Sequence, residues 1–347
     1  MTSNIEKTIA RQQEKIAAGS FYEAHQQLRV IAARYMRQSK YDAAAEILTG
    51  GAKALLRAGS QQGASASGGD LAIMLVIEVY TKAEWEISEE NDAASRAHKK
   101  RLIELLREFP PDEPSRKRYI SEIIGWSSKF GPLERGDPEI HHAVGSVYAE
   151  ENEPYDAEKH LIIGTTDSAE TLAKLEFEWY TGDDSHTAAL YASRAVIPYL
   201  LTGNLRSANK ALLIFTSRLS SVNPSLASQH VSSASSDIRI YPSLPLLNFL
   251  GLLLVAVQRG SADLFRDLTR HYAPHIQEVG IWNDALAQIG EMYFNIKIPR
   301  QGNPLLDMMG SMFFGGNNQS GGNQKPGASS RAASKRVEAA PSSAELD

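Results

Sequence analysis

GSFYEAHQQL, at residues 19–28, is the stretch from which the fold of this chain is predicted. A small or polar turn is followed by a large apolar residue, by an alanine three positions later, and by another apolar residue four positions after that. The same order returns at residues 39–48 (SKYDAAAEIL) and 203–212 (GNLRSANKAL), with a weaker copy at 155–158. The turn lets the chain reverse, and the alanine lets a neighbouring helix approach closely. The pattern therefore predicts stacked pairs of α-helices.

Apolar residues recur at helical spacing through nearly all of the chain, and we expect roughly fourteen helices of ordinary length. Only residues 238–241 have a strand-like pattern, so the sheet content is at most a small β-hairpin there. The copies of the pattern are unevenly spaced, which indicates a degenerate repeat. We predict an all-α fold, an α-solenoid of TPR-like helical pairs. A closed helical bundle is the alternative.

Polar residues in front of several apolar runs have the character of helix N-caps, because their side chains can accept hydrogen bonds from first-turn amides. These residues are Asp92, Asp137, Asp167, Asp184 and Ser261. Three segments rich in Gly, Ser and polar residues are predicted to be disordered, because they contain too little apolar surface to offset the entropy of ordering. These segments are residues 59–69, 225–236 and 315–347.

The composition excludes several classes of protein. The 347 residues include no cysteine, so disulfides and thiolate metal sites are ruled out, as suits a reducing compartment. The net charge of −5 gives no general attraction to nucleic acid. The most apolar run, residues 244–257, is too short to span a bilayer, and residues 1–15 lack the apolar core of a signal peptide. We expect a soluble cytosolic protein.

Charge is distributed unevenly along the chain. Residues 1–58 contain nine basic and five acidic residues, whereas residues 134–184 contain fourteen acidic and three basic residues. The first two predicted helices contain five of the basic residues: Arg11, Lys15, Arg29, Arg34 and Arg37. A basic end on an acidic protein is typical of docking to an acidic partner. Ordinary solvated helix faces are the alternative reading.

A second candidate surface lies in the most apolar part of the chain. Apolar residues occur here on all sides of the predicted helix. The residues of this surface are Ile240, Tyr241, Leu244, Leu246, Leu247, Phe249, Leu250 and Leu253. Such a helix must be covered on two sides. Either it is a central helix buried within the array, or a partner supplies the second cover.

No arrangement of residues indicates catalysis. The pair His141-His142 points to different faces of a helix, and with Asp137 supplies too few ligands for a metal. The run from Asp183 to His186 is explained by helix capping, since sequence neighbours do not form a catalytic triad. The sequence also lacks a phosphate-binding loop. We therefore expect a protein that is not an enzyme and needs no metal or cofactor.

Seven motifs in order resemble one known family. They are residues 19–29 (GSFYEAHQQLR), 34–40 (RYMRQSK), 70–71 (DL), 126–130 (WSSKF), 136–138 (GDP), 245–249 (PLLNF) and 293–296 (YFNI), with MM at 308–309 and FFGG at 313–316 resembling the family's C-terminal end. Each motif is weak by itself, but their common order is specific. The chain resembles the Golgi-to-ER traffic protein 4 family, which acts in the targeting of tail-anchored membrane proteins.

The resemblance implies a solenoid scaffold with two partners. Residues 1–150 would dock the dimeric ATPase that carries tail-anchored proteins, and residues 151–300 would bind the N-terminal segment of a ubiquitin-like adaptor, for insertion of tail-anchored proteins into the ER membrane. The basic residues above, with His25 and Asp70, are the candidate ATPase contacts. An N-cap role is the alternative for Asp70, and the apolar stretch from Ile240 to Leu253 is the candidate adaptor site. A helical-repeat adaptor of another cytosolic assembly remains the alternative function.

Overall fold

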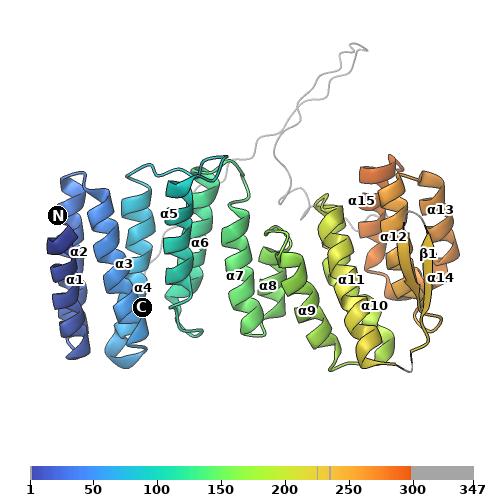
Figure 1. Ribbon diagram of the computed structural model, residues 1–347, viewed down its shortest axis with the longest axis horizontal. Helices are drawn as coiled ribbons and strands as arrows, with labels where there is room; N and C mark the ends of the chain where they lie inside the picture. Colours follow the sequence, from blue (N-terminus) through green and yellow to red (C-terminus); the bar gives the residue numbers. More distant parts are fainter. Residues whose placement is uncertain (1, 225, 234–235, 298–347) are drawn as a thin grey trace, which may run out of the picture. The chain divides into compact units, whose positions relative to one another are not determined.

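The computed structural model describes residues 2–224, 226–233 and 236–297, and over these residues the chain is an α-solenoid. The first half contains α1 (Thr2–Ala17), α2 (Phe21–Arg37), α3 (Tyr41–Arg57), α4 (Ala64–Met74), α5 (Ala93–Leu106), α6 (Ser115–Lys129) and α7 (Pro138–Glu150). The second half contains α8 (Pro154–Leu161), α9 (Ser168–Tyr180), α10 (Ala188–Leu201), α11 (Leu205–Val222), β1 (Gln229–Ser233), β2 (Ser236–Ile240), α12 (Pro245–Arg259), α13 (Ala262–His271), α14 (Ala273–Val279) and α15 (Trp282–Phe294). The helices follow one another along a row (Figure 1).

The repeated sequence pattern marks the starts of α2, α3 and α11. Its turn residues Gly19, Ser39 and Gly203 have φ of 80°, 55° and 78°, the left-handed region in which helices commonly end. In each case two backbone amides after the preceding helix donate hydrogen bonds to carbonyls of its last turn. Ser20 N, for example, donates to Lys15 O at 2.9 Å. The alanines Ala24, Ala44 and Ala208 are fully buried, as the prediction of close helix packing requires.

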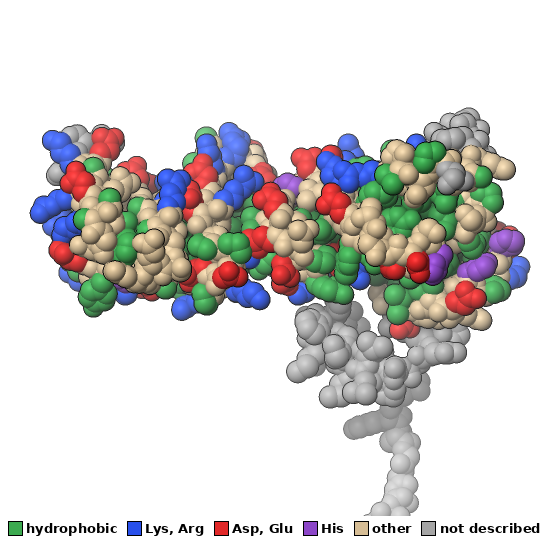
Figure 2. Space-filling model, turned by 90° about the horizontal axis from the view of Figure 1, so that it is seen from below, with side chains coloured by type: hydrophobic (Ala, Val, Ile, Leu, Met, Phe, Trp, Pro, Cys, Tyr) green, Lys and Arg blue, Asp and Glu red, His purple; other side chains and the backbone are tan. Residues whose placement is uncertain are grey.

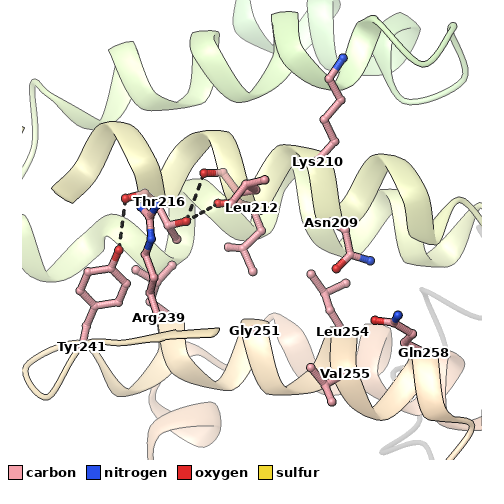
Figure 3. Close-up of a pocket in the computed structure, with 12 residues that line it drawn as sticks. Asn209, Lys210, Leu212, Thr216, Arg239, Tyr241, Gly251, Leu254, Val255 and Gln258 are labelled. Atoms are coloured by element: carbon pink, nitrogen blue, oxygen red, sulfur yellow. Dashed lines mark hydrogen bonds between the residues drawn. The ribbon is translucent and has the colours of Figure 1, made fainter. Parts of the chain in front are cut away.

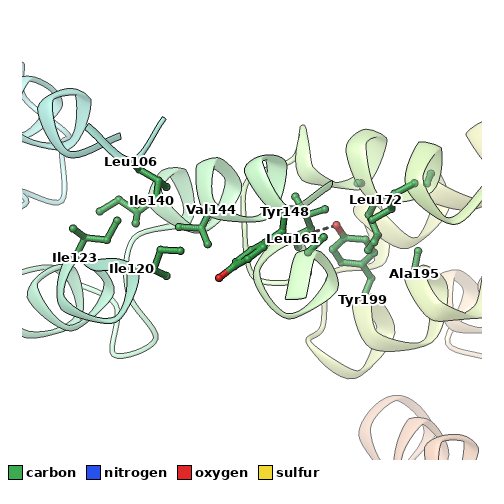
Figure 4. Close-up of a cluster of buried hydrophobic side chains, with 14 of the residues drawn as sticks. Leu106, Ile120, Ile123, Ile140, Val144, Tyr148, Leu161, Leu172, Ala195 and Tyr199 are labelled. Carbon is green, nitrogen blue, oxygen red and sulfur yellow. Dashed lines mark hydrogen bonds between the residues drawn. The ribbon is translucent and has the colours of Figure 1, made fainter. Parts of the chain in front are cut away.

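The hydrophobic core runs along the row without interruption. Figure 4 shows part of it, from Leu106 and Ile123 through Val144 and Leu161 to Tyr199, in α5 to α10. Helices α7 and α8 pack directly on each other. The core is therefore continuous across residue 150. The predicted division into residues 1–150 and 151–300 remains a proposal about which partner each half binds.

The prediction of disorder at residues 59–69 is wrong. Ala64–Gly69 form the first turns of α4, which packs between α3 and α6. Gly68 and Gly69 are in this helix because there is no room for a side chain: a Cβ at Gly68 would lie 2.8 Å from Leu56 N, and one at Gly69 would lie 1.9 Å from Ser115 Oγ. Asp70 is consequently inside α4, so its alternative role as an N-cap is also wrong.

The predicted hairpin is present, and it is longer than expected. Strands β1 and β2 pair antiparallel, with Gln229 opposite Ile240. Part of the second segment predicted to be disordered is therefore a strand, because its backbone groups are paired with β2. The third such segment, residues 315–347, lies outside the described residues. Among the helices that the structure describes, none is long and apolar enough to cross a membrane.

Three of the five predicted N-caps are confirmed by hydrogen bonds. The side chains of Asp92, Asp137 and Ser261 accept from first-turn amides of α5, α7 and α13. Asp167 and Asp184 also precede helices, but their side chains make no capping hydrogen bond to the described residues.

Candidate binding surfaces

The N-terminal surface brings together residues from α2 and α4. His25 and Arg29 lie one helical turn apart on α2, and both contact one carboxylate oxygen of Asp70 on α4. His25 Nε2 is 2.8 Å from Asp70 Oδ2, and Arg29 Nη1 donates to the same atom at 3.1 Å. His25 is almost fully buried, whereas the side chains of Arg29 and Asp70 are about half exposed. Three predicted residues thus form one network.

The remaining predicted basic residues are separate from this network. Lys15 joins α1 to α2 by contacting Glu23 at 2.5 Å and Gln27 at 3.1 Å, and its hydrogen bond holds the pKa of Glu23 below the ordinary value. The side chains of Arg11, Arg34 and Arg37 are exposed. Figure 2 shows Lys and Arg side chains around the α1–α2 end of the row.

Sequence reasoning missed two apolar members of this surface. Tyr22 is 74% exposed and Val30 is 69% exposed, and both lie on α2. Their spacing places them on the same face as Gln26, Arg29 and Arg37. The signal in the sequence was that Tyr22 and Val30 are large apolar residues at positions that do not match the helical spacing of the buried residues of α2. This face, which we call the α2 stripe, is mixed apolar and basic.

A groove of about 360 Å³ lies between α11, α12 and β2. Its floor is apolar, from Leu212, Leu213, Leu247, Leu254 and Val255. Gly251 on α12 also lines it and contributes no side chain, which leaves space between the two helices. Leu213 is 60% exposed, an unusual position for a leucine on a helix that packs on three others. Figure 3 shows Leu212 on α11 and Leu254 on α12, on opposite sides of the groove.

Tyr241 and Asn248 fix the end of the hairpin at this groove. The buried side chain of Asn248 accepts from Tyr241 N at 2.7 Å and donates to Tyr241 O at 2.8 Å. The Tyr241 hydroxyl donates to Thr216 O at 3.1 Å and lies 2.8 Å from Ser220 Oγ. These bonds, part of which Figure 3 draws, tie β2 to both α11 and α12. We call them the hairpin clamp.

The structure divides the predicted adaptor residues into two groups. Ile240 and Leu246 are partly buried, whereas Tyr241 and Leu247 line the groove but are almost fully buried within the chain. The other four are almost fully buried by the array itself: Leu244, Phe249, Leu250 and Leu253. Phe249, for example, packs against Tyr272 and Trp282. Sequence reasoning missed Leu213, Leu254 and Arg239, because no local pattern reveals which residues of distant helices meet.

Two buried titratable clusters lie in the middle of the row. Glu176 is completely buried, 3.4 Å from Arg194, which also pairs with Glu158. His141 Nδ1 is 3.0 Å from His160 Nδ1, and burial lowers the pKa of His160 to about 4. His142 points elsewhere, to Ser168, as expected for adjacent helical residues. Among the described residues, no three His, Asp or Glu side chains are grouped as metal ligands.

Comparisons with known proteins agree with the fold and with the sequence motifs. Residues 38–313 match the family model described as Golgi to ER traffic protein 4. The chain is 74% identical to Golgi to ER traffic protein 4 of Aspergillus fumigatus over the full length of both, and 36% identical to that of Schizosaccharomyces pombe over 85% of this chain and 91% of the relative. It is 27% identical to the Homo sapiens homolog, with 88% of each chain covered.

A solved structure has the same architecture. The crystal structure of C. therm. Get4 superposes with a TM-score of 0.79 at 51% sequence identity, covering 90% of this chain and 96% of that one. The family match spans well over half of the chain, and two of the relatives are more than 30% identical over most of their length. This chain belongs to the Golgi to ER traffic protein 4 family.

Proposed function

We propose that this chain is a non-catalytic cytosolic scaffold that bridges a tail-anchored-protein targeting ATPase and a ubiquitin-like adaptor. The observation that supports this proposal best is the presence of two chemically different surfaces on one continuous core. The α2 stripe is exposed and mixes basic with apolar side chains, whereas the groove between α11 and α12 is mainly apolar and recessed. Family membership adds the pathway, the insertion of tail-anchored proteins into the ER membrane.

The ATPase docks on the α2 stripe in this proposal. Arg29 and Arg37 attract an acidic surface, and the exposed side chains of Tyr22 and Val30 supply apolar contact at short range. Asp70 holds Arg29 and His25 through one carboxylate oxygen, so both side chains are ordered before the partner arrives. Residues that are already ordered lose less conformational entropy on binding.

The adaptor's N-terminal segment occupies the groove in this proposal. Leu213 and the apolar floor around Gly251 lose their remaining contact with water when the segment binds, which is the main source of affinity. The buried residues Phe249, Leu250 and Leu253 support this floor from beneath. Tyr241 and Leu247 are almost fully buried as well, so all five hold the shape of the groove, and the contacts with the adaptor come from the exposed side chain of Leu213 and the surface around Gly251.

The proposal is tested by reconstitution of the three proteins, with complexes resolved by size-exclusion chromatography. The wild-type chain is expected to carry both partners in one complex. A double variant, Arg29→Glu with Arg37→Glu, is expected to lose the ATPase and keep the adaptor. Leu213→Asp, at a position exposed enough to tolerate a charge, is expected to lose the adaptor and keep the ATPase. If both variants assemble the full complex, these two surfaces are not the docking sites.

A further inference from the structure

The groove has a cationic end. Arg239 on β2 lines it beside Tyr241, and its side chain extends from the strand toward Thr216 on α11 (Figure 3). We propose that Arg239 binds a carboxylate of the docked segment, so that the segment is amphipathic, acidic at the Tyr241 end and apolar along the rest of the groove. This inference rests on the proposed function, since it names the chemistry of the segment that the groove accepts.

Arg239 has the donors for this role. Its side chain is half-buried and makes no hydrogen bond or ion pair with the residues that the structure describes. The hydroxyls closest to it in Figure 3 are engaged elsewhere: Thr216 Oγ1 donates to Leu212 O at 2.8 Å, and the Tyr241 hydroxyl donates to Thr216 O. A guanidinium offers five N–H donors in a planar fork that fits a carboxylate.

The opposite end of the groove is different, which gives the segment a direction. Asn209, Lys210 and Gln258 line that end. Lys210 turns away from the groove toward α9 (Figure 3), where its Nζ lies 3.5 Å from Glu170 and 3.8 Å from Asp167. Two carboxylates therefore offset its charge. A carboxylate in the ligand is attracted to the Arg239 end, and neutral polar groups suit the Asn209 end.

The hairpin clamp places Arg239 before any ligand arrives. Tyr241, two residues further along the chain, is bound through its backbone to Asn248 and through its hydroxyl to α11. The backbone that carries Arg239 is thus anchored to both walls of the groove. On the side of the groove, positioning Arg239 then costs only the ordering of its side chain, which favours recognition of a single carboxylate at a fixed position.

The test measures binding of synthetic copies of the adaptor's N-terminal segment to the full-length chain by fluorescence anisotropy. Arg239→Ala is expected to weaken binding about tenfold, the effect of losing a charge-assisted hydrogen bond. Arg239→Lys should recover only part of this loss, because an ammonium lacks the planar fork. Arg206→Ala is the matched control, since Arg206 is exposed on α11 and does not line the groove.

Replacing each Asp or Glu of the peptide by its amide identifies the bound carboxylate. One replacement is expected to weaken binding to the wild-type chain about tenfold and to have little further effect on Arg239→Ala, because both changes remove the same interaction. Equal affinities of wild type and Arg239→Ala would overturn the inference while leaving the proposed function intact. Failure of the wild-type chain to bind the peptide would instead contradict the proposed adaptor site.

Discussion

At the scale of single residues, the cluster around Glu176 shows how burial decides charge. The carboxyl of Glu176 is fully inaccessible, and Glu158 and Arg194 are its charged neighbours. Burial, followed by the nearby carboxyl of Glu158, raises the pKa of Glu176 far above its ordinary value of 4.5. Arg194 already pairs with the partly buried carboxylate of Glu158, so we infer that the fully buried Glu176 keeps its proton at neutral pH.

The raised pKa predicts how stability depends on pH. A carboxyl that binds its proton more tightly in the folded state stabilises the fold fully below its unfolded pKa, and this contribution declines as pH rises above 4.5 toward the folded value. The decline approaches about 1.4 kcal/mol per pH unit for one proton. Glu176→Gln should remove it. The free energy of unfolding of this variant, measured by urea titrations at pH 5 to 9, should fall less as pH rises than that of the wild type.

Glu178→Gln is the matched control for this prediction. Glu178 is two residues away on α9, but 64% of its side chain is exposed. The same substitution there should leave the pH dependence of the wild type unchanged. Parallel pH profiles for Glu176→Gln and the wild type would mean that Glu176 is ionised in the folded protein.

At the scale of helices and strands, local patterns were predictable and packing was not. The starts of α2, α3 and α11 followed from the order of a turn, a large apolar residue and an alanine, because the turn depends on neighbours in sequence. The first turns of α4 were missed, and its start was predicted at Asp70, because its first residues, ASASGG, have the composition of a linker. Those small residues are required by α3 and α6, which the sequence alone does not place beside them.

The candidate sites follow the same division. The basic residues of α2 and the apolar run of α12 were found, because charge and hydropathy are visible along the sequence. The contact of Asp70 with His25 and Arg29 was not expected, since 41 and 45 residues separate the partners. The groove likewise depends on α11, whose Leu213 gave no signal beyond one leucine at an exposed helical position.

Two glycines within helices predict opposite effects of one substitution. A Cβ at Gly68 would lie 2.8 Å from Leu56 N and 3.0 Å from Ala52 O, backbone atoms that do not yield easily. Gly68→Ala should therefore destabilise the protein by about 1–3 kcal/mol. A Cβ at Gly125, within α6, would meet no neighbouring atom within 4 Å. Gly125→Ala should stabilise by about 0.5–1 kcal/mol through helix propensity.

Thermal and urea unfolding of the two variants tests this pair of expectations. Because both substitutions add the same methyl group within a helix, differences in the unfolded state largely cancel. A Gly68→Ala variant as stable as Gly125→Ala would show that α3 and α4 are packed less closely than the structure describes.

At the scale of the molecule, buried ion pairs connect successive helices between the two proposed docking surfaces. Lys99 of α5 pairs with Asp137 at the start of α7, at 3.1 Å. Arg116 of α6 pairs with Glu151, which ends α7, at 2.5 Å. Arg194 of α10 pairs with Glu158 of α8 and lies 3.4 Å from Glu176 of α9, which is protonated. Three of the fourteen acidic residues of the segment 134–184 thus join helices, which explains part of the charge of this segment without a partner. Helices joined in this way hold the two proposed docking surfaces at a defined separation.

The ATPase surface predicts separate effects on association and dissociation rates. Charges at the edge of an interface act mainly on association, whereas direct contacts act mainly on dissociation. Arg29→Glu should slow association several-fold and make it less sensitive to salt, because the attraction to an acidic partner is reduced. Asp70→Asn should speed association, since it removes a negative charge. It should also speed dissociation by about tenfold, because it releases His25 and Arg29, which Asp70 orders in the proposed docking surface.

Stopped-flow measurements with the purified ATPase at several salt concentrations separate these two rates. Glu46→Gln is a suitable control for the loss of one negative charge, because Glu46 is exposed on α3. Glu46 takes part neither in the contacts of Asp70 nor in those of Lys15. If Asp70→Asn changes association as Glu46→Gln does and leaves dissociation unchanged, Asp70 contributes only its charge, and the ordering of His25 and Arg29 does not contribute to binding. If Asp70→Asn slows association, the partner surface is basic there, and the proposed attraction between the α2 stripe and an acidic face is wrong.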